Sequence, residues 1–304
     1  MKHHFLLRLW RARHHPLLKI KTKIASFRKI KNYSFYAEKL TGKNGIEIGG
    51  PSAIFKDHRI LPIYKVIKNL DGCNFSNTTI WEGRISSGYN YKYHRLKPDG
   101  YQYIADAVDL NIIESTKYDF VLSCYCLEHI ANPFKAVSEW LRILKEDGYL
   151  LMIVPHKEGT FDHKRQVTPF EHLKEDFKKN IGEDDLTHLE EILKLHDLGK
   201  DPDTGNFELL KKRSLDNFNN RCLHQHVFDT NLALMILDYL GLKILSVDVV
   251  LPYAIITLSQ KVGDKENVNN EEFFGDDAKH KKNSLFAIDR KKRLSFSVLN
   301  DLFQ

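Results

Sequence analysis

A strand–helix–strand pattern near the middle of this 304-residue chain most constrains how it folds. An apolar run at 118–125 is long enough for a buried strand, and a second run follows at 149–154. Between the two runs, apolar side chains recur at helical spacing, at Phe134, Val137, Leu141 and Leu144. Pro133 suits the first turn of that helix, and Gly148 suits the turn after it. This order predicts a parallel βαβ unit.

The rest of the chain repeats this alternation. Short apolar segments at 46–48, 64–67 and 101–105 are predicted strands. Segments 243–250 and 253–259 are separated by only two residues, which favours an antiparallel hairpin. We therefore expect an α/β fold: a Rossmann-like, doubly wound, mostly parallel sheet with an antiparallel hairpin at its edge, plus a polar helical insertion.

Changes in composition divide the chain into three parts. Residues 1–41 form a basic arm, residues 42–262 the folded domain, and residues 263–304 a polar tail that we expect to be partly disordered. Within the domain, residues 157–221 interrupt the strand–helix alternation and are rich in His and Asp. Within the tail, residues 263–283 have the composition of a linker.

The positive charge lies in the arm. The formal net charge is +6, yet residues 1–31 hold ten Lys or Arg and no acidic residue, which leaves 36 basic and 40 acidic side chains elsewhere. An acidic body with a short basic arm argues against nucleic acid as a partner. The arm also carries apolar residues such as Trp10, and Pro16 interrupts any single helix there. It could lie on an anionic membrane, but we favour a frayed tail or a segment that docks onto a protein.

Cysteine usage and hydropathy favour the cytoplasm. The chain has four cysteines and no CxxC pair, so we expect no disulfide framework. No apolar stretch approaches the roughly 20 residues that span a bilayer. Arg8, Arg11 and Arg13 interrupt the apolar cluster near the N-terminus, so a secretory signal is not expected.

Four motifs follow one another along the folded domain, at residues 45–50, 106–110, 118–130 and 141–155. The first ends a strand in a glycine turn, and the last two contain the βαβ unit. In this order and at this spacing, the motifs resemble those of class I S-adenosylmethionine-dependent methyltransferases, closest to the branch that acts on small molecules. The resemblance covers residues 45–156 and resumes at 224–260.

The resemblance implies that S-adenosylmethionine binds beyond the carboxyl ends of the strands. Gly49 and Gly50 would let the backbone approach the amino-acid part of the cofactor, and Glu47 would orient this turn or meet the cofactor's ammonium group through water. Asp71, 22 residues after Gly49, would accept hydrogen bonds from the ribose hydroxyls. Pro51 departs from the family's usual glycine turn, because it donates no N–H.

Four more cofactor-binding positions follow from the resemblance. Asp106 would accept a hydrogen bond from the adenine amine, and Ala107 would leave space for the ring. Ser123 and Tyr125 lie at the end of the fourth strand of the family's sheet, where they would border the cofactor.

Histidines gather where a catalytic base would be needed. Methyl transfer to a protonated nucleophile needs a base on the loops beyond the strands, and seven of the fifteen histidines lie between residues 156 and 226. Three interpretations compete: hydrogen-bonded groups of a polar insertion, a catalytic His oriented by an Asp, or a divalent metal that lowers the pKa of an acceptor hydroxyl. We favour a base, in the order His163, His156 and His226, and assign no residue to a metal.

The polar insertion favours a hydroxyl-rich acceptor. We therefore expect O-methylation of a small polar molecule such as a sugar or a glycan precursor. Two other classes of function stay open. Residues 195–200 are similar to the His-Asp core of HD-type metal-dependent phosphohydrolases, although a methyltransferase framework surrounds them. The chain could also be a catalytically silent partner protein that binds S-adenosylmethionine.

Overall fold

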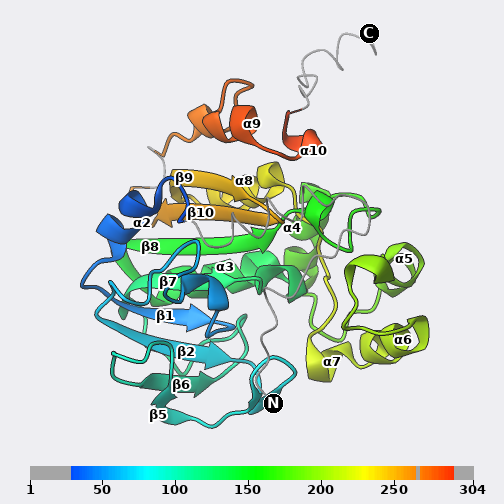
Figure 1. Ribbon diagram of the computed structural model, residues 1–304, viewed down its shortest axis with the longest axis horizontal. Helices are drawn as coiled ribbons and strands as arrows, with labels where there is room; N and C mark the ends of the chain where they lie inside the picture. Colours follow the sequence, from blue (N-terminus) through cyan, green and yellow to red (C-terminus); the bar gives the residue numbers. More distant parts are fainter. Residues whose placement is uncertain (1–28, 265–267, 291–304) are drawn as a thin grey trace.

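The computed structural model describes residues 29–264 and 268–290, which form an eight-stranded sheet with helices on both faces (Figure 1). The strand order is β5-β6-β2-β1-β7-β8-β10-β9. In chain order these strands are β1 (Asn44–Ile48), β2 (Asn69–Asn74), β5 (Gly88–Tyr91), β6 (Gly100–Ile104), β7 (Tyr118–Cys124), β8 (Leu144–Pro155), β9 (Lys243–Val250) and β10 (Ala254–Gln260). A separate hairpin pairs β3 (Thr78–Thr79) with β4 (Gly83–Arg84).

The strand order creates a switch point at β1. This strand pairs in parallel with β2 on one side and with β7 on the other. The chain first moves outward from β1 through β2 to β6 and then returns to β7. In an open sheet of this kind, the ligand crevice forms at the carboxyl ends of the strands where the order reverses.

The predicted α/β architecture is confirmed. β7, α3 (Pro133–Ile143) and β8 form the expected parallel βαβ unit, and the Asn132 side chain caps the helix by accepting a hydrogen bond from Lys135 N at 3.1 Å. At the other end of the sheet, β10 runs antiparallel to both β8 and β9. The hairpin expected at this edge is therefore present.

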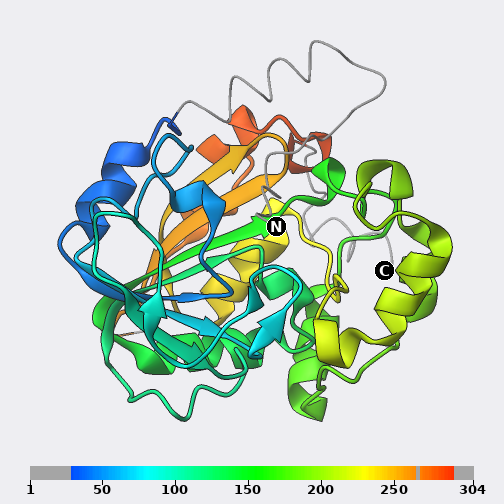
Figure 2. The same ribbon diagram turned by 60° about the horizontal axis from the view of Figure 1, so that its bottom comes forward.

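Apolar layers cover both faces of the sheet. On one face, α3 and α8 (Thr230–Tyr239) contribute buried side chains such as Trp140 and Leu234. On the other face, α2 (Tyr33–Leu40) and the crossover that contains η1 (Ala53–Phe55) bury Tyr36 and Phe55. Figure 2 shows α2 and α8 on opposite sides of the strands. The site residues at the strand ends thus rest on a sheet that is packed from both sides.

The insertion contributes four helices. α4 (Phe170–Lys179) packs on α3. The other three, α5 (Leu189–Leu195), α6 (Phe207–Leu215) and α7 (Asn217–Asn220), stand on the side toward which β1 and β2 point (Figure 1). Because this is the side of the carboxyl ends, the insertion lies where an acceptor-binding region was expected.

The second predicted strand is misplaced. Residues 64–67 form no strand, and the expected turn at Asp71 and Gly72 lies inside β2. The apolar character of 64–67 instead reflects burial of the crossover beneath the sheet. Gly72 fits inside a strand because the Tyr91 ring covers it: a Cβ on Gly72 would lie 2.2 Å from Tyr91 Cδ2.

Part of the predicted linker, 263–283, has regular structure. It contains η5 (Glu271–Phe273) and α9 (Lys279–Asn283), and α10 (Ala287–Arg290) follows. Asn270 fixes the segment to the domain, because its amide donates to Leu242 O at 2.9 Å and its carbonyl oxygen accepts from Ile244 N at 2.9 Å. At Asn270, the polar composition of this segment thus reflects hydrogen bonds to the domain rather than a free linker.

The basic arm lies mostly outside the described residues. Residues 1–28 are not described, so the docking and membrane hypotheses for residues 1–31 stay predictions. Among the residues that are described, no helix is both long and apolar enough to cross a membrane.

Candidate functional site

The turn after β1 lies at the carboxyl edge of the sheet, at the switch point in strand order. Gly49 has a φ of +80°, a conformation that side chains with a Cβ rarely adopt. A Cβ on Gly49 would lie 3.1 Å from Cys126 Sγ, on the chain that leaves β7. The turn therefore needs glycine both for its backbone conformation and for the close approach of the two strand ends.

Glu47 orients this turn from below. Its carboxylate is fully buried and accepts hydrogen bonds from Ser52 N at 3.0 Å and from the hydroxyls of Tyr64 and Tyr91, each at 2.6 Å. Burial raises the pKa of Glu47 above its ordinary value. A Cβ on Gly50 would lie 2.2 Å from Glu47 Cδ, so Gly50 packs on the carboxylate. Of the two roles considered for Glu47, the geometry favours orientation of the turn.

Asp71 does not lie at the ligand edge of β2. It is three residues before the carboxyl end of the strand, and its two oxygens accept hydrogen bonds from Tyr101 N at 2.8 Å and from the Tyr118 hydroxyl at 2.6 Å. Because both oxygens are engaged within the sheet, the geometry does not favour its expected role as ribose acceptor. The polar residue at the strand end is Asn74, which is buried beside the glycine turn and donates to Gly50 O at 3.0 Å.

Asp106 follows β6 and lies at the same edge. One carboxylate oxygen accepts from Val108 N at 3.2 Å, and the other from the Arg221 guanidinium at 3.0 Å. Arg221 also pairs with Glu183 at 3.1 Å, so it joins the insertion to the end of β6. Next to Asp106, the Ala107 carbonyl accepts a hydrogen bond from Trp140 Nε1 at 3.1 Å, which fixes the loop on α3.

The exit of β7 supplies the remaining predicted cofactor positions. Ser123 is fully buried within the strand, and its hydroxyl has no hydrogen-bond partner among the described residues. Tyr125 has a left-handed backbone with φ of +52°, and its ring contacts Tyr253 at 5.4 Å between centroids. The side chain of Tyr125 thus packs toward the β9–β10 hairpin, while Cys126 faces the glycine turn.

A His–Asp pair lies beyond β7. Asp162, at the start of the insertion, accepts from Nδ1 of His224 at 2.5 Å. Burial alone would lower the pKa of His224, but the Asp162 carboxylate and Glu128 outweigh burial and raise it. The pKa of Asp162 is lowered, because His224 and Arg165 together outweigh the effect of its burial. An ionised Asp162 holds the Nδ1 proton, which leaves Nε2 of a neutral His224 as an acceptor.

Glu128 and His129 adjoin this pair. Burial raises the pKa of Glu128 to about 7 and, together with His224, lowers the pKa of His129 to about 3. Nδ1 of His129 donates to Leu223 O at 2.9 Å, whereas Glu128 Oε2 is buried with no hydrogen-bond partner among the described residues. One donor atom each of Glu128, His129 and His224 lies within 4.8 Å of the others, so this group could also hold a divalent ion.

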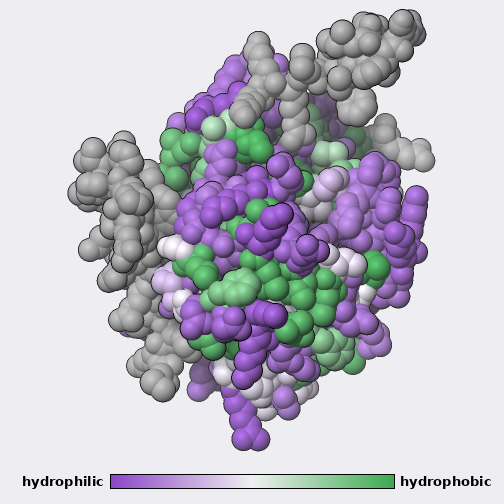
Figure 3. All heavy atoms as spheres, turned by 90° about the vertical axis from the view of Figure 1, so that its right-hand side faces the viewer, coloured by the Kyte–Doolittle hydropathy of each residue, from purple (hydrophilic) through white to green (hydrophobic). Residues whose placement is uncertain are grey.

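Aromatic rings surround the pair. The ring of Trp81, from the β3–β4 hairpin, lies 5.3 Å from His129, and the ring of Phe161 lies 4.5 Å from His224. Figure 3 faces the side that carries α5, α6 and α7, and on it apolar groups gather amid hydrophilic ones. The exposed apolar side chains of α6 and α7 are Phe207, Leu209, Leu215 and Phe218.

The first two predicted bases are engaged elsewhere. Nε2 of His163 lies 2.8 Å from Asp197, on a partly exposed part of the insertion. His156 is fully buried at the end of β8: its Nδ1 accepts from Glu158 N at 3.2 Å, its Nε2 faces Asp289 at 3.3 Å, and Phe286 stacks on its ring. Both nitrogens of His156 are therefore occupied, which removes it as a base.

The third predicted base, His226, belongs to a second histidine group with His172 and His188. Burial lowers the pKa of His226 to about 3 and also lowers the pKa of His188. His226 thus stays neutral, and its Nε2 donates to Ala131 O at 3.0 Å.

The residues similar to the HD-type core do not form one metal-binding group. His196 faces Asp201 at 3.1 Å, while Asp197 faces His163. Neither residue belongs to a group of three metal-ligating side chains in the described part of the chain.

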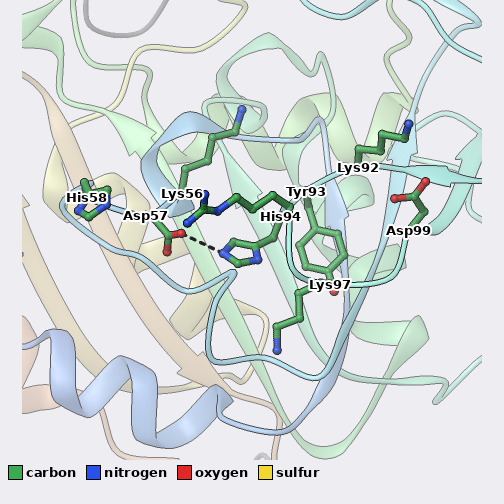
Figure 4. Close-up of a pocket in the computed structure, with 9 residues that line it drawn as sticks. Lys56, Asp57, His58, Lys92, Tyr93, His94, Lys97 and Asp99 are labelled. Carbon is green, nitrogen blue, oxygen red and sulfur yellow. Dashed lines mark hydrogen bonds and ion pairs between the residues drawn. The ribbon is translucent and has the colours of Figure 1, made fainter.

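A cavity of about 690 Å³ is formed by other residues than those of this site. Its lining comes from the crossover after β1 and from residues 92–99, and it includes several lysines (Figure 4). His94 points toward Asp57 there, with 3.1 Å between Nε2 and Oδ2. No residue of the His224 group lines this cavity.

Sequence reasoning missed Asn74, Trp81, Arg221 and the Asp162–His224 pair. The neighbouring Asp162 and His163 are a local signal, but the partner of Asp162 lies 62 residues away along the chain, where no local pattern indicates it.

Comparison with known proteins finds one family model that matches part of the chain. The model of a methyltransferase domain family matches residues 75–152. A search of curated proteins returned no match.

Solved structures of S-adenosylmethionine-dependent methyltransferases are similar to the chain at low sequence identity. The one from Thermotoga maritima is 15% identical, with 80% of this chain and 94% of that chain covered and a TM-score of 0.40. The one from Methanosarcina mazei is 14% identical, with 76% and 98% covered and a TM-score of 0.41. The one from Aquifex aeolicus is 12% identical, with 79% and 93% covered and a TM-score of 0.38.

The family match and the architecture agree. The matched residues run from the end of β2 through β6, β7 and α3 into β8, which are the elements that frame the crevice. Gly49 stands at the end of β1, so close to Cys126 at the exit of β7 that a Cβ would crowd the thiol. Part of the chain, residues 75–152, is thus similar to a methyltransferase domain, and the fold around it is the Rossmann-like one that the sequence predicts.

Proposed function

We propose that the enzyme transfers a methyl group to a hydroxyl oxygen of a small polar acceptor, such as a sugar or a glycan precursor, and that His224 takes the hydroxyl proton. One observation carries this proposal: the 2.5 Å contact between His224 Nδ1 and Asp162 at the carboxyl edge of the sheet. Among the histidines between residues 156 and 226, His224 combines a buried carboxylate partner with a position beside the exit of β7.

The cofactor would lie along the strand ends. The Gly49 turn would take its amino-acid part, Asn74 would bond the ribose hydroxyls, and Asp106 would accept from the adenine amine. When bound, S-adenosylmethionine supplies a methyl group activated by its sulfonium centre, so the protein need not activate the donor. The chain's own task is then to align the acceptor and remove its proton.

Asp162 and its neighbours make His224 suitable for this task. The ionised carboxylate fixes the Nδ1 proton, so the Nε2 lone pair is the only one left on the ring. Arg165 donates to Asp162 at 3.1 Å and keeps the carboxylate ionised. A base with this arrangement contributes typically 10²–10⁴-fold to a proton-transfer step.

The surroundings favour a polar acceptor. Glu128 Oε2 and the ring edges of His129 and His224 offer hydrogen-bonding groups, and Trp81 offers an apolar ring face against which a sugar ring could pack. This mixture of polar groups and one aromatic face suits a small hydroxylated molecule better than a lipid.

The same three polar side chains supply a second mechanism for the same reaction. Nδ1 of His129 and of His224 are both engaged, so a divalent ion bound by both Nε2 atoms and Glu128 would lower the pKa of the acceptor hydroxyl. This mechanism requires the ion for turnover, whereas the base mechanism does not.

An acceptor screen tests the proposal. The purified full-length chain is incubated with S-adenosylmethionine and panels of sugars, amino sugars and amines, and release of the demethylated cofactor is measured. We expect release with hydroxyl acceptors, and mass spectrometry should locate the methyl group on oxygen. Transfer confined to amines would contradict the proposal. Turnover that a chelator abolishes and Mg²⁺ or Mn²⁺ restores would replace the base by the metal mechanism.

A further inference from the structure

The second histidine group lies on the insertion side of the sheet. His172 is in α4, His188 immediately precedes α5, and His226 lies in the segment that leads to α8. One ring nitrogen of each lies within 4.8 Å of one ring nitrogen of the other two. Nε2 of His172 and Nε2 of His188 are only 3.0 Å apart.

His226 offers a nitrogen with no described partner. Its Nε2 donates to the backbone carbonyl of Ala131, so the lone pair of the ring is on Nδ1. His226 is 1% exposed, and Nδ1 has no hydrogen-bond partner among the described residues. A buried acceptor without a partner is costly, and metal-binding histidines commonly use their other N–H in this way, on a backbone carbonyl.

A carboxylate stands beside the group. Asp176, one turn after His172 on α4, has its Oδ2 3.3 Å from His172 Nε2 and 3.8 Å from His226 Nε2. This oxygen is buried and, within the described part of the chain, accepts no hydrogen bond. Asp176 Oδ2 and the ring of His226, each with one buried acceptor atom, thus stand beside two imidazole nitrogens that face each other.

We propose that His172, His188 and His226 bind one Zn²⁺ ion, with Asp176 or a water molecule as the fourth ligand. Three imidazoles and one oxygen suit tetrahedral Zn²⁺, in which Zn–N distances of 2.0–2.1 Å place neighbouring nitrogens about 3.3 Å apart. The 3.0 Å separation of the His172 and His188 nitrogens is already close to this value. The ligands come from three segments, so the ion would tie α4 and the start of α5 to the segment before α8.

This site is separate from the proposed base. His226 N donates to Glu128 O at 3.3 Å, so the two histidine groups are neighbours through the backbone, but they share no ligand atom. The zinc proposal therefore does not depend on the acceptor or on the role of His224.

Zinc titration of the full-length chain tests the proposal. Metal is removed with a chelator, and Zn²⁺ is then added in competition with a chromophoric chelator. We expect one tight equivalent for the wild type and a loss of affinity of about 100-fold or more in His172→Ala and in His188→Ala. Both side chains are only half-buried, so the variants should fold, which circular dichroism checks.

His163→Ala is the matched control. His163 lies in the same insertion and pairs with Asp197, but it belongs to neither histidine group, so its loss should leave zinc affinity unchanged. Unchanged affinity in His172→Ala and His188→Ala would overturn the proposal. Loss of the tight equivalent in His129→Ala alone would also overturn it, because the ion would then sit in the Glu128 group.

Spectroscopy of the wild type needs no variant. With Co²⁺ in place of Zn²⁺, we expect the intense visible absorption of a tetrahedral site. X-ray absorption of the zinc form should show a coordination shell that contains three imidazole ligands. An octahedral, all-oxygen shell would contradict the proposed ligands.

Discussion

His224 and His226 stand two residues apart, yet their surroundings differ in kind. His224 meets a carboxylate, Asp162, at 2.5 Å, and its pKa is raised. His226 donates through Nε2 to a backbone carbonyl, and burial lowers its pKa to about 3. The carboxylate near His224 is in hydrogen-bond contact, whereas the nearest one to His226, Asp176, is 3.8 Å from Nε2, so one imidazole is placed to exchange a proton and the other stays neutral. Proximity in sequence therefore says little about the protonation behaviour of a histidine, which depends on the group that its ring contacts.

The same contrast separates the strand ends from the insertion. The glycine turn and the end of β6 are fixed by contacts within the sheet, whereas the insertion attaches through ion pairs and histidines. Four substitutions test this difference.

The largest effect is expected at His224. His224→Ala removes the proposed base, so we expect turnover to fall by about 10²–10⁴-fold with little change in cofactor affinity. The control is His163→Ala, which keeps the pair intact and should keep turnover near wild type. Steady-state rates and calorimetric cofactor binding measure both. Equal turnover in the two variants would remove His224 from the mechanism.

The next effect tests the link between the two regions. Arg221→Ala leaves Glu183 buried without its cation, since the Glu183 side chain is 6% exposed, and we expect a loss of about 3 kcal/mol in the free energy of unfolding. Lys145→Ala breaks a more exposed ion pair with Asp119 and should cost under about 1 kcal/mol. Urea unfolding compares them, and similar losses would show that Arg221 does not anchor the insertion.

A pH effect on stability is expected from the insertion. Burial alone would raise the pKa of Asp201. Its contacts with His196, Thr204 and Arg213 outweigh burial and lower this pKa to about 2 from an ordinary value of 3.8. A depressed acid pKa stabilises the fold above pH 3.8, and this stability is lost as the pH falls toward about 2. Its full size is about 2 kcal/mol. Unfolding followed from pH 6 to pH 3 should show the wild type approaching Asp201→Asn; a constant difference between them would contradict this assignment.

The smallest effect is expected at the glycine turn. Gly49→Ala forces a Cβ into a positive-φ residue and against Cys126, so we expect a cost of about 1–2 kcal/mol and roughly tenfold weaker cofactor binding. Gly42→Ala is the matched control: its φ is +71° with nothing within 4 Å of the added Cβ. It should lower stability similarly but leave cofactor affinity unchanged.

Much of the fold could be predicted from the sequence. The βαβ unit of β7, α3 and β8 was readable because the spacing of apolar residues and the Pro133 start are local signals. The second strand was misplaced, since the apolar run at 64–67 belongs to a buried crossover and the glycine in β2 packs against Tyr91. The candidate site was less readable still: Asp71 has the residue type of a ribose acceptor, but its place in the strand turns its oxygens to Tyr101 and Tyr118.

The sequence by itself determined the alternation of strands and helices, the glycine turn and the similarity of residues 75–152 to a methyltransferase domain, because each depends on residues close together in the chain. Only the tertiary structure decided which histidine meets which partner. The contacts of His224 with Asp162 and of His156 with Asp289 span 62 and 133 residues. Contacts over such separations are set by the closing of the whole fold, so no local pattern records them.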